Sequence, residues 1–551
     1  MVIALGATGF MAASASSSPR AEASAPAIAS QAGRAQANRT TTTALGDLLT
    51  YDYNNARSGD DTLDPAISNL SSAPAWDDHA LDGAVYGEPL VYDATVYVAT
   101  ENDSVYAIAA DSGHVLWRLH VGTAVSDALI HTTPGVGCGD ISPVGITGTP
   151  VIDAAKGEIF VAEETESPGT SNWQGIRHWL VAISLTSHRV LWHRDIDPPG
   201  GNNPSDYYIP AEQQRPAITL ANERLYVEFG GLAGDCGQYH GYVVELPESG
   251  NGTLGSYQVP TQREGAIWET DGAVVSPTGD LYVATGNGSS NSIAHFDEGN
   301  SVVELSPSLE RIGYWAPSDW VQLNDQDWDL GSAGPINVPG TSLIFIAGKP
   351  GSSDDAGFLL HEGQLHGIGR GAYTGAACLS GGDFGADASD LIGKRIFIYA
   401  ACGGGTEAFQ VTTSPVAFHR VWEASSGSPN GSPIVAGGLV WALDWNNALV
   451  YGINPATGHV IVRRSTDALD HFVAPGVGDK MLFVPTAYGV EAFRALGDPF
   501  GKNGVESAVA APLEPVHTPP EVKATAASGV ATRKLKLSST YRCTLSASWW
   551  L

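Results

Sequence analysis

A strand-like triplet recurs along this chain, and it limits the possible folds more than any other feature. Eight copies, mostly apolar–aromatic–apolar, follow one another at intervals of 43 to 66 residues. Each copy comes after a short stretch rich in small residues and proline, and several are followed by another strand, a turn and a tryptophan. Each unit therefore predicts four strands, and a four-stranded sheet repeated eight times is typical of a β-propeller. The triplets begin at Val96, Ile159, Leu225, Leu281, Ile344, Ile396, Leu439 and Leu482.

The eighth unit is incomplete, and this indicates how the ring closes. After Leu482 the pattern reaches VEAFRAL and then runs into a Pro/Ala-rich stretch, so it lacks an outer strand. The segment PAWDDHAL, residues 74–81, precedes the first unit and carries the tryptophan expected of an outer strand. We therefore expect an all-β, eight-bladed β-propeller of four-stranded antiparallel blades over residues 48–496, with the ring closed by this N-terminal strand.

Both ends of the chain differ from the propeller. Residues 1–15 are apolar and small like a secretory signal, although a disordered Ala-rich leader is the alternative. Residues 16–47 are predicted to be a disordered linker, and residues 497–551 a Pro/Ala-rich linker followed by a basic tail. A secretory signal would make the protein secreted or extracytoplasmic.

The net charge excludes two classes of partner. The chain of 551 residues has 28 Lys and Arg against 59 Asp and Glu, so its net charge is −31. Nucleic acid and anionic membranes both require a cationic face, and neither is expected as the main partner. No stretch reaches the roughly 18 uninterrupted apolar residues of a membrane span. The acidic surface favours a soluble monomer.

The cysteine pattern favours disulfides over metal binding. The five cysteines form no CxxC pair, which excludes a zinc ribbon, and no CxxCH, which excludes a c-type haem attachment site. In an exported protein, four of them are predicted to form the pairs Cys138–Cys236 and Cys378–Cys402. Cys543 is then left over in the basic tail.

The residues just before each innermost strand are predicted to meet around a central funnel, where propellers bind ligands. They are chemically mixed, whereas a purely structural hub would more often be small and apolar. Polar rims also occur in propellers that only bind a partner, so the set alone does not distinguish an enzyme from a binding protein. The rim set is Tyr86, Glu88, Thr147, Gln214, Arg215, Trp268, Asp271, Asp329, Ser332, Asp383, Asn430 and His471.

Four local motifs resemble those of the quinoprotein dehydrogenases, eight-bladed propellers that bind pyrroloquinoline quinone (PQQ) and usually calcium. Within that family the chain looks most like the polyvinyl-alcohol-dehydrogenase type and related PQQ-repeat proteins without a haem domain. The resemblance covers roughly residues 51–496. The motifs are WETDGAVVSPTGDLYVATGN (268–287), DWDLGSAGP (327–335), IAGKPG (346–351), and VAEETES followed by GIRHWLVAISL in the second blade.

The first three motifs imply a site made of four residues. Trp268 would stack on the quinone, because a planar cofactor needs an aromatic face. Asn287 would bind calcium, which prefers hard oxygen ligands. Asp329 would be the general base and would also bind calcium, and Lys349 would contact the quinone oxygens.

The remaining site residues follow less directly. The fourth motif implies an acidic calcium ligand in the second blade, and Glu166 is preferred over the alternatives Glu163 and Glu164. Two charged members of the rim set, Glu88 and Arg215, are predicted to bind the cofactor as well.

A purely structural explanation stands beside each of these roles. Trp268 would suit packing between blades, and Asn287 lies in a TGNG sequence that forms a turn in any case. The alternating aspartates at 325–329 would suit a solvated loop or a separate structural calcium loop, and Lys349 would suit an exposed turn.

Two departures from the family limit the functional prediction. The adjacent Cys–Cys pair of many alcohol-oxidising members is absent, since the comparable region contains only Cys138, and there is no haem-binding segment. We therefore predict a PQQ- and calcium-dependent dehydrogenase that oxidises a small alcohol or sugar-like substrate and passes electrons to an external acceptor. The alternatives are a non-catalytic exported propeller that binds a protein or polymer at its rim, and an envelope scaffold.

Overall fold

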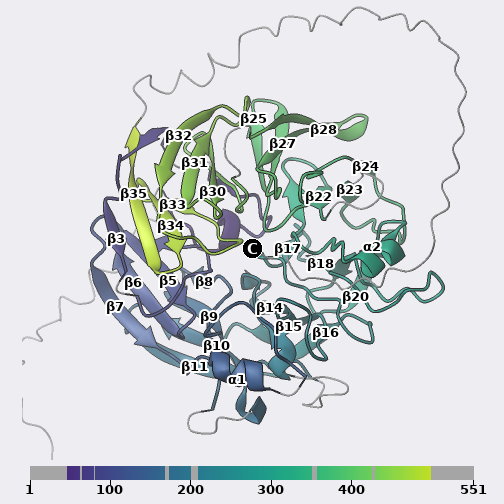
Figure 1. The fold of residues 1–551 in the computed structure, drawn as a ribbon, viewed down its shortest axis with the longest axis horizontal. Helices are drawn as coiled ribbons and strands as arrows, with labels where there is room; N and C mark the ends of the chain where they lie inside the picture. The colour runs from purple at the N-terminus through teal and green to yellow at the C-terminus, as the bar shows by residue number, and fades with distance from the viewer. Residues whose placement is uncertain are drawn as a thin grey trace, which may run out of the picture. The chain divides into compact units, whose positions relative to one another are not determined.

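The computed structural model describes residues 46–497, except for 62–64, 80, 134, 168–172, 200–208, 350–355 and 425–428. The predicted leader, the basic tail with Cys543 and nearly all of both linkers lie outside the described residues. Within them, eight antiparallel sheets follow one another around a central axis (Figure 1). The predicted all-β, eight-bladed propeller is confirmed.

Each blade is a four-stranded antiparallel meander whose first strand lies nearest the axis (Figure 1). Blade 1 contains β4 (Leu90–Tyr92), β5 (Thr95–Thr100), β6 (Ser104–Ala109) and β7 (Val115–His120), and blade 2 contains β8 (Val151–Asp153), β9 (Glu158–Thr165), β10 (Arg177–Ser184) and β11 (Arg189–Asp195). Blade 3 contains β13 (Thr219–Ala221), β14 (Arg224–Gly231), β15 (Tyr242–Pro247) and β16 (Gly255–Gln258), with β12 (Glu212–Gln213) beside β14. Blade 4 contains β17 (Val274–Val275), β18 (Leu281–Ala284), β19 (Val302–Leu305) and β20 (Arg311–Trp315). Blade 5 contains β21 (Ile336–Val338), β22 (Leu343–Ala347), β23 (Gly357–His361) and β24 (Tyr373–Gly375). Blade 6 contains β25 (Ala388–Ile392), β26 (Arg395–Ala400), β27 (Glu407–Thr413) and β28 (Val416–Glu423). Blade 7 contains β29 (Ile434–Ala436), β30 (Leu439–Asp444), β31 (Leu449–Ile453) and β32 (Val460–Ser465).

Blade 8 is completed by the start of the chain. Its own strands are β33 (Gly476–Gly478), β34 (Met481–Thr486) and β35 (Gly489–Gly497). The outer edge of β35 pairs antiparallel with two N-terminal strands, β2 (Ile67–Leu70) and β3 (Trp76–Asp78). The predicted closing strand is therefore confirmed, and the ring has no unpaired gap between its first and last blades.

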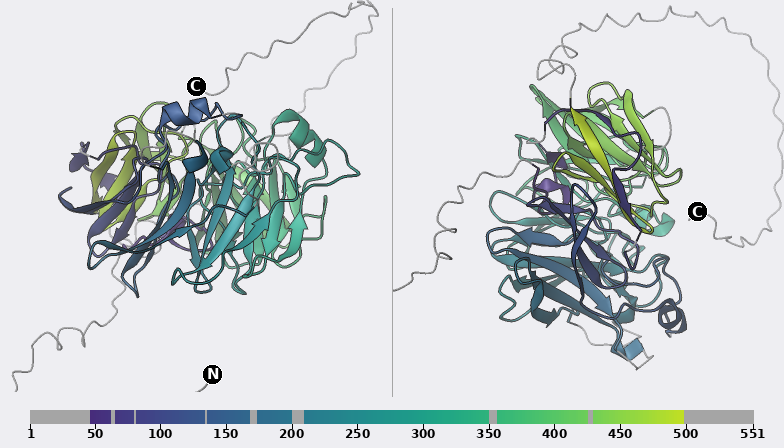
Figure 2. Two further views of the ribbon diagram at one scale, coloured as in Figure 1. Left: turned by 90° about the horizontal axis from the view of Figure 1, so that it is seen from below. Right: turned by 90° about the vertical axis from the view of Figure 1, so that its left-hand side faces the viewer.

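Short helices occupy some of the connections. They are α1 (Asp127–Thr132) and α2 (Trp320–Gln326), with 3-10 turns η2 (Tyr51–Tyr53), η3 (Trp173–Gly175) and η4 (Ile209–Ala211). Both α-helices lie on the same face of the ring (Figure 2). Among the described residues, no helix has both the length and the apolar character needed to cross a membrane.

The recurring tryptophans join neighbouring blades. Trp76, on the closing strand, donates a hydrogen bond to the backbone oxygen of Ala110 at 2.9 Å and lies over Gly113 in the next blade. A Cβ atom at Gly113 would lie 2.8 Å from the indole, so only glycine permits this contact. Trp422 makes the same contact with Gly458 of the following blade. This repeated contact explains why a turn and a tryptophan recur in the sequence.

The middle of the ring is filled by an N-terminal segment, residues 48–61, that we call the axial segment. It contacts the innermost strand of every blade, which places it along the axis (Figure 1, purple). These bonds satisfy backbone groups of strands that have no other neighbour on the axial side. The partner residues are Val91, Ile152, Leu220, Val275, Asn337, Ser389, Val435 and Val477.

Arg57 brings a positive charge from the axial segment into the centre of the ring. Its side chain is 0% exposed, and its guanidinium donates hydrogen bonds to Thr50 Oγ1 at 3.1 Å, Tyr51 O at 3.0 Å and Thr219 Oγ1 at 2.6 Å. We call this buried centre the hub. Four buried acidic side chains act electrostatically on the guanidinium, and burial raises the pKa of each of them. They belong to Asp52, Glu88, Glu228 and Asp271.

Two disulfides link loops of the ring, and both match the predicted pairs. Cys138–Cys236 joins the connection before blade 2 to blade 3, with 5.9 Å between the Cα atoms. Cys378–Cys402 joins blades 5 and 6, with 4.9 Å between the Cα atoms. Both lie in the loops between strands, so they hold the loop conformation rather than the sheets.

Candidate active site

A small pocket lies against the axial segment, near the centre of the ring. Its lining comes from the axial segment and blades 1, 2, 3, 4 and 8, so it forms where the loops between blades converge. The lining combines aromatic and polar side chains. The lining residues are Tyr51, Tyr86, Thr147, Thr149, Arg215, Thr270, His471 and Phe472.

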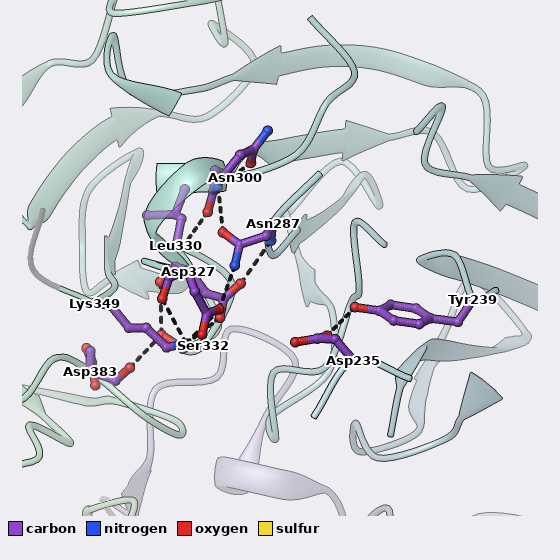
Figure 3. A network of polar contacts seen from close by, with 11 residues as sticks. Asp235, Tyr239, Asn287, Asn300, Asp327, Leu330, Ser332, Lys349 and Asp383 are labelled. Atoms are coloured by element: carbon purple, nitrogen blue, oxygen red, sulfur yellow. Dashed lines mark hydrogen bonds and ion pairs between the residues drawn. The ribbon is translucent and has the colours of Figure 1, made fainter. Parts of the chain in front are cut away.

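A second group of polar side chains gathers on loops of blades 4 and 5 (Figure 3). Lys349 Nζ lies 2.6 Å from Asp329 Oδ2 and 3.5 Å from Asp327 Oδ1. The other oxygen of Asp329 accepts a hydrogen bond from the backbone N–H of Asn287 at 2.9 Å, and the Asn287 amide donates to Asp327 at 2.8 Å. Three of the residues predicted from motifs therefore meet in one network.

Trp268 belongs to the same site. A Cβ atom at Gly286 would lie 2.9 Å from Asp329 Oδ1 and 3.3 Å from Trp268 Nε1. Glycine at this position therefore lets the indole and the carboxylate approach the same stretch of backbone. Trp268 is half-buried, packed on Tyr239 and its neighbours in one apolar cluster. All four residues of the first three motifs converge, although their chemical roles remain predictions.

The end of α2 positions the carboxylates. Helix α2 stops at Gln326, and Asp327 takes a left-handed conformation with φ 57°. The backbone N–H of Trp328 then bonds back to Leu323 O, so the chain reverses and directs Asp329 into the ring. Asp329 is only 2% exposed as a result.

Hydrogen bonds from amide side chains hold this turn in place. Asn300 is 0% exposed and donates to Asn287 Oδ1 at 3.0 Å and to Asn324 Oδ1 at 2.7 Å. Its own oxygen accepts the backbone N–H of Leu330 at 2.8 Å. A fully bonded amide of this kind fixes the blade 4 loop against the Asp329 loop.

Electrostatics keep Lys349 positively charged. Burial alone would lower the pKa of its ammonium, but the negative charges of Asp329 and Asp327 outweigh burial and raise the pKa above its ordinary value. Burial is the main cause of a raised pKa at Asp327, and Lys349 opposes it. The site therefore presents a fixed cation next to a buried carboxylate.

Two phenylalanines connect Lys349 with the pocket. Lys349 Nζ lies 5.9 Å from the ring centre of Phe384, whose ring stacks on Phe472 with centroids 5.9 Å apart. The guanidinium of Arg215 lies 4.4 Å from the centre of the Phe472 ring. The network and the pocket are thus two parts of one funnel, with an arginine at one end and a lysine at the other.

Arg215 differs from most buried cations in its lack of an anionic partner. Within the described part of the chain, no hydrogen bond or ion pair of its guanidinium is present, and its partner is the Phe472 ring. Burial lowers the pKa of Arg215, while the more distant charge of Asp140 opposes that shift. His471 beside it has a pKa lowered to about 4, by burial first and by Arg215 second, so it is neutral at pH 7.

Two predicted site residues lie apart from the network. Glu88 is 1% exposed in the hub, where it accepts the backbone N–H of Asp52 at 2.9 Å, because the axial segment covers it. Glu166 accepts hydrogen bonds from the backbone and side chain of Ser126, at 3.2 and 2.9 Å. Neither contacts Asn287 or Asp329, and their predicted roles in cofactor and calcium binding remain predictions.

The alternative acids of blade 2 are also occupied. Glu163 contacts His193 at 2.8 Å, and Glu164 lies 3.6 Å from the buried His178. Asp327 therefore replaces a blade 2 glutamate as the second carboxylate of the network. In the sequence, Asp327 is only one member of an alternating run of aspartates.

Several contributors carry no local sequence signal. Asn300, Asn324 and Asp235 act through contacts between loops that are distant in the sequence. For Asp235, the position next to Cys236 was the available signal, because a predicted disulfide anchors a loop close to the funnel.

Some of the side chains suit a planar, polyanionic quinone. In the pocket, Arg215 offers a cation, and Thr147 and Thr270 offer hydroxyl groups. Trp268, a half-buried aromatic side chain, and Lys349 belong to the network and are not among the residues that line the pocket. The unpaired guanidinium of Arg215 is the decisive feature, because a cofactor carboxylate would give it the partner that the described residues do not provide.

The fit to calcium is partial. The network offers oxygen atoms of Asp327, Asp329 and Asn287, whereas calcium takes about six to eight oxygen ligands. Among the described residues, no group of three or more His, Cys, Asp or Glu side chains is arranged to hold a metal ion. Calcium binding would therefore require further oxygens from water or from the cofactor.

Comparison with known proteins supports the fold. Residues 66–300 match a PQQ-family model described as outer membrane protein assembly factor BamB. A quinohaemoprotein alcohol dehydrogenase from Pseudomonas putida HK5 has a similar structure, with a TM-score of 0.57 and 15% identity over 83% of this chain and 81% of that chain.

Two further structures share this fold. The quinohaemoprotein alcohol dehydrogenase of Comamonas testosteroni has a TM-score of 0.55 and 15% identity, over 82% of this chain and 81% of that chain. A europium-containing methanol dehydrogenase has a TM-score of 0.52 and 14% identity, over 84% of this chain and 92% of that chain. A search of curated protein sequences found no match. At these identities the likeness concerns the fold.

Proposed function

We propose that this propeller is a PQQ- and calcium-dependent dehydrogenase that oxidises an alcohol or sugar-like substrate in its funnel. The observation that carries the proposal is the convergence of Trp268, Asn287, Asp329 and Lys349 beside a pocket with an unpaired arginine.

PQQ, when bound, would supply the quinone that accepts hydride from the substrate carbon. Trp268 would stack on its ring, and Arg215 would hold a carboxylate at the far end of the pocket. Lys349 would hold the quinone end, since its ammonium is kept charged and lies at the other end of the funnel.

Asp329 would act as the base. Its Oδ2 lies at the funnel beside Lys349, while its Oδ1 is fixed by the Asn287 backbone. A buried carboxylate held at one oxygen keeps the other directed, which is what removal of a proton from a substrate hydroxyl requires. The neighbouring ammonium would stabilise the carboxylate before the transfer and the alkoxide character that develops during it.

Calcium would be held by Asn287 and Asp329, with Asp327 as the added carboxylate. When bound, it would polarise an oxygen of the reacting group as a Lewis acid. Since Lys349 already lies between the same two aspartates, binding would require the ammonium to move toward the quinone side.

An extracytoplasmic location suits this chemistry. Two disulfides are stable in oxidising compartments, and they favour export of the chain. An enzyme without a haem would deliver its electrons to a separate acceptor.

Reconstitution tests the proposal directly. The purified full chain is mixed with PQQ and calcium, and a panel of alcohols and sugars is supplied with an artificial electron-accepting dye. We expect a change in quinone absorbance on binding and dye reduction that depends on both additions. The variant K349A should lose dye reduction, whereas K394A, in the exposed turn between β25 and β26, should retain it. Absence of both signals in the wild-type chain would refute the proposal.

A second candidate function is a non-catalytic propeller that binds a protein. The match of residues 66–300 to a model described as an outer membrane protein assembly factor supports this candidate. It predicts no PQQ-dependent absorbance change and binding that survives R215M and D329N, because neither residue would be needed at a protein-binding rim.

A further inference from the structure

A carboxylate that no sequence motif indicated faces the network from blade 3. Asp235 follows β14, and Figure 3 shows its side chain directed toward Lys349 and its partners across the funnel. The charges of Asp329, Asp327 and Lys349 all act on the pKa of Asp235, so these groups share one space. Burial is the main cause of the raised pKa of Asp235.

Several contacts hold Asp235 in place. The phenol of Tyr239, which is 1% exposed, donates a hydrogen bond to Asp235 Oδ1. Arg263 donates to the backbone oxygen of Asp235 and, at 2.8 Å, to that of Gly237. The next residue, Cys236, is tied to Cys138 by a disulfide. These contacts fix the position of the loop, and the Asp235 carboxylate is directed toward the funnel rather than into the protein interior.

The second oxygen of Asp235 is available to a ligand. Tyr239 occupies Oδ1, and within the described residues no hydrogen bond to Oδ2 is present. This oxygen is also not enclosed in the protein interior, since the residue is only half-buried. A carboxylate that is fixed at one oxygen and open at the other is suited to accepting a hydrogen bond from a donor group on a ligand.

We propose that Asp235 is a second substrate-binding residue, which accepts a hydrogen bond from another hydroxyl group of a diol or polyol while the first hydroxyl is oxidised at Asp329. The proposal rests on the proposed function and names its substrate class. It follows from the juxtaposition of two carboxylates from different blades across one funnel. A simple alcohol would fill only the Asp329 side.

The local charges favour a neutral donor over an anionic group. Asp235, Glu264, Asp327 and Asp329 all act on this space, and Lys349 and Arg263 are the only cations that oppose them among the described groups acting on Glu264 and Asp235. A carboxylate on the substrate would be repelled. A hydroxyl donor adds no charge and pairs with Oδ2.

The test compares paired substrates in the reconstituted protein. The specificity constant kcat/KM is measured for 1-propanol and for a series of terminal diols from 1,3-propanediol to 1,6-hexanediol, with wild type, D235N and E264Q. D235N turns the open acceptor into an NH₂ donor while the Tyr239 bond persists. We expect the ratio of diol to propanol to fall about 10- to 100-fold in D235N, because a polar site rejects a ligand that it no longer matches.

E264Q is the matched control. It removes one negative charge from the same loop region, where Glu264 is already paired with Arg263, and leaves Asp235 intact. The diol-to-propanol ratio should then stay within about twofold of wild type. An unchanged ratio in D235N, or an equal fall in D235N and E264Q, would overturn the role of Asp235.

A binding measurement separates this proposal from the proposed function. Saturation-transfer NMR reports binding of 1,3-propanediol to the protein without turnover, and we expect a weaker signal in D235N than in wild type. A wild-type chain that oxidises no alcohol, yet loses diol binding in D235N, would refute the dehydrogenase and retain the Asp235 site. Equal signals in both proteins would overturn the Asp235 site itself.

Discussion

Two arginines near the axis have opposite surroundings. Arg57 in the hub makes three hydrogen bonds and is encircled by buried carboxylates. Arg215 in the funnel lies over the Phe472 ring, and within the described residues it has no hydrogen bond or ion pair. Two guanidinium nitrogens of Arg57 are thus hydrogen-bonded in the hub, whereas the contact of the Arg215 guanidinium is an aromatic ring.

The comparison distinguishes charge that stabilises the ring from charge that is available to a ligand. A buried cation without a partner costs free energy, so such a group persists where function needs it. The aspartates show the same division, since Asp383 lies 0% exposed in the interior whereas Asp329 contacts a half-buried lysine at the funnel. Substitutions at these pairs should therefore have effects of different kinds.

The largest effect is expected from R57M. Removing the guanidinium breaks three buried hydrogen bonds and takes a cation away from a group of buried acids, and loss of one partner from a buried charge network costs about 3–5 kcal/mol. Urea denaturation followed by tryptophan fluorescence measures the free energy of unfolding. R215M serves as the control and should lose less than about 1 kcal/mol. Equal losses in the two variants would contradict the distinction between hub and funnel.

D329N should have the next largest effect, on activity rather than on stability. Asparagine keeps an oxygen for the Asn287 backbone but cannot take the substrate proton, so kcat should fall about 10²- to 10⁴-fold. Steady-state dye reduction by the PQQ-loaded protein measures this. D280N, in the turn between β17 and β18, should retain kcat within about threefold. Similar losses in D329N and D280N would remove the case for Asp329 as the base.

R215M should weaken cofactor binding while leaving the fold intact. A hydrogen bond to a charged group contributes about 1.5–3 kcal/mol, so the Kd for PQQ should rise about 10- to 100-fold. Titration of the intrinsic tryptophan fluorescence with PQQ gives this constant. R215K should recover part of the affinity, because it restores the charge without the planar guanidinium. An unchanged Kd in R215M would mean that the pocket arginine does not contact the cofactor.

The last comparison concerns pH and the interior acids. Burial raises the pKa of Asp383 from 3.8 to about 7. Between those values the folded chain holds a proton that the unfolded chain has lost, so stability falls as pH rises from about 4 to 7. D383N removes this contribution and should flatten the curve by at most about 1.4 kcal/mol per pH unit. Urea denaturation across this range measures the slope, and D325N, at an exposed position of α2, should parallel wild type.

The sequence was sufficient to predict the ring, the closing strand and both disulfides, because each depends on a pattern that is local or repeated. Trp268, Asn287, Asp329 and Lys349 were found through short motifs whose backbone conformation the motif itself determines. Glu88 was expected at the rim, but the axial segment occupies the centre and leaves that position inside the hub. Asn300 and Asp235 were missed because their partners lie on other loops, and no spacing along the chain encodes such contacts.

The axial segment also constrains the order in which the molecule is completed. Its residues emerge from the ribosome before any of the strands that they contact, and the last partner, Val477, is made some four hundred residues later. The closing strands β2 and β3 likewise wait for β35. Such end-to-start contacts make folding slow, because distant parts of the chain must meet before their contacts stabilise it. A nascent chain would therefore stay open until synthesis is nearly finished. A translocation channel would accept such an open chain, whereas a closed ring would not enter the channel.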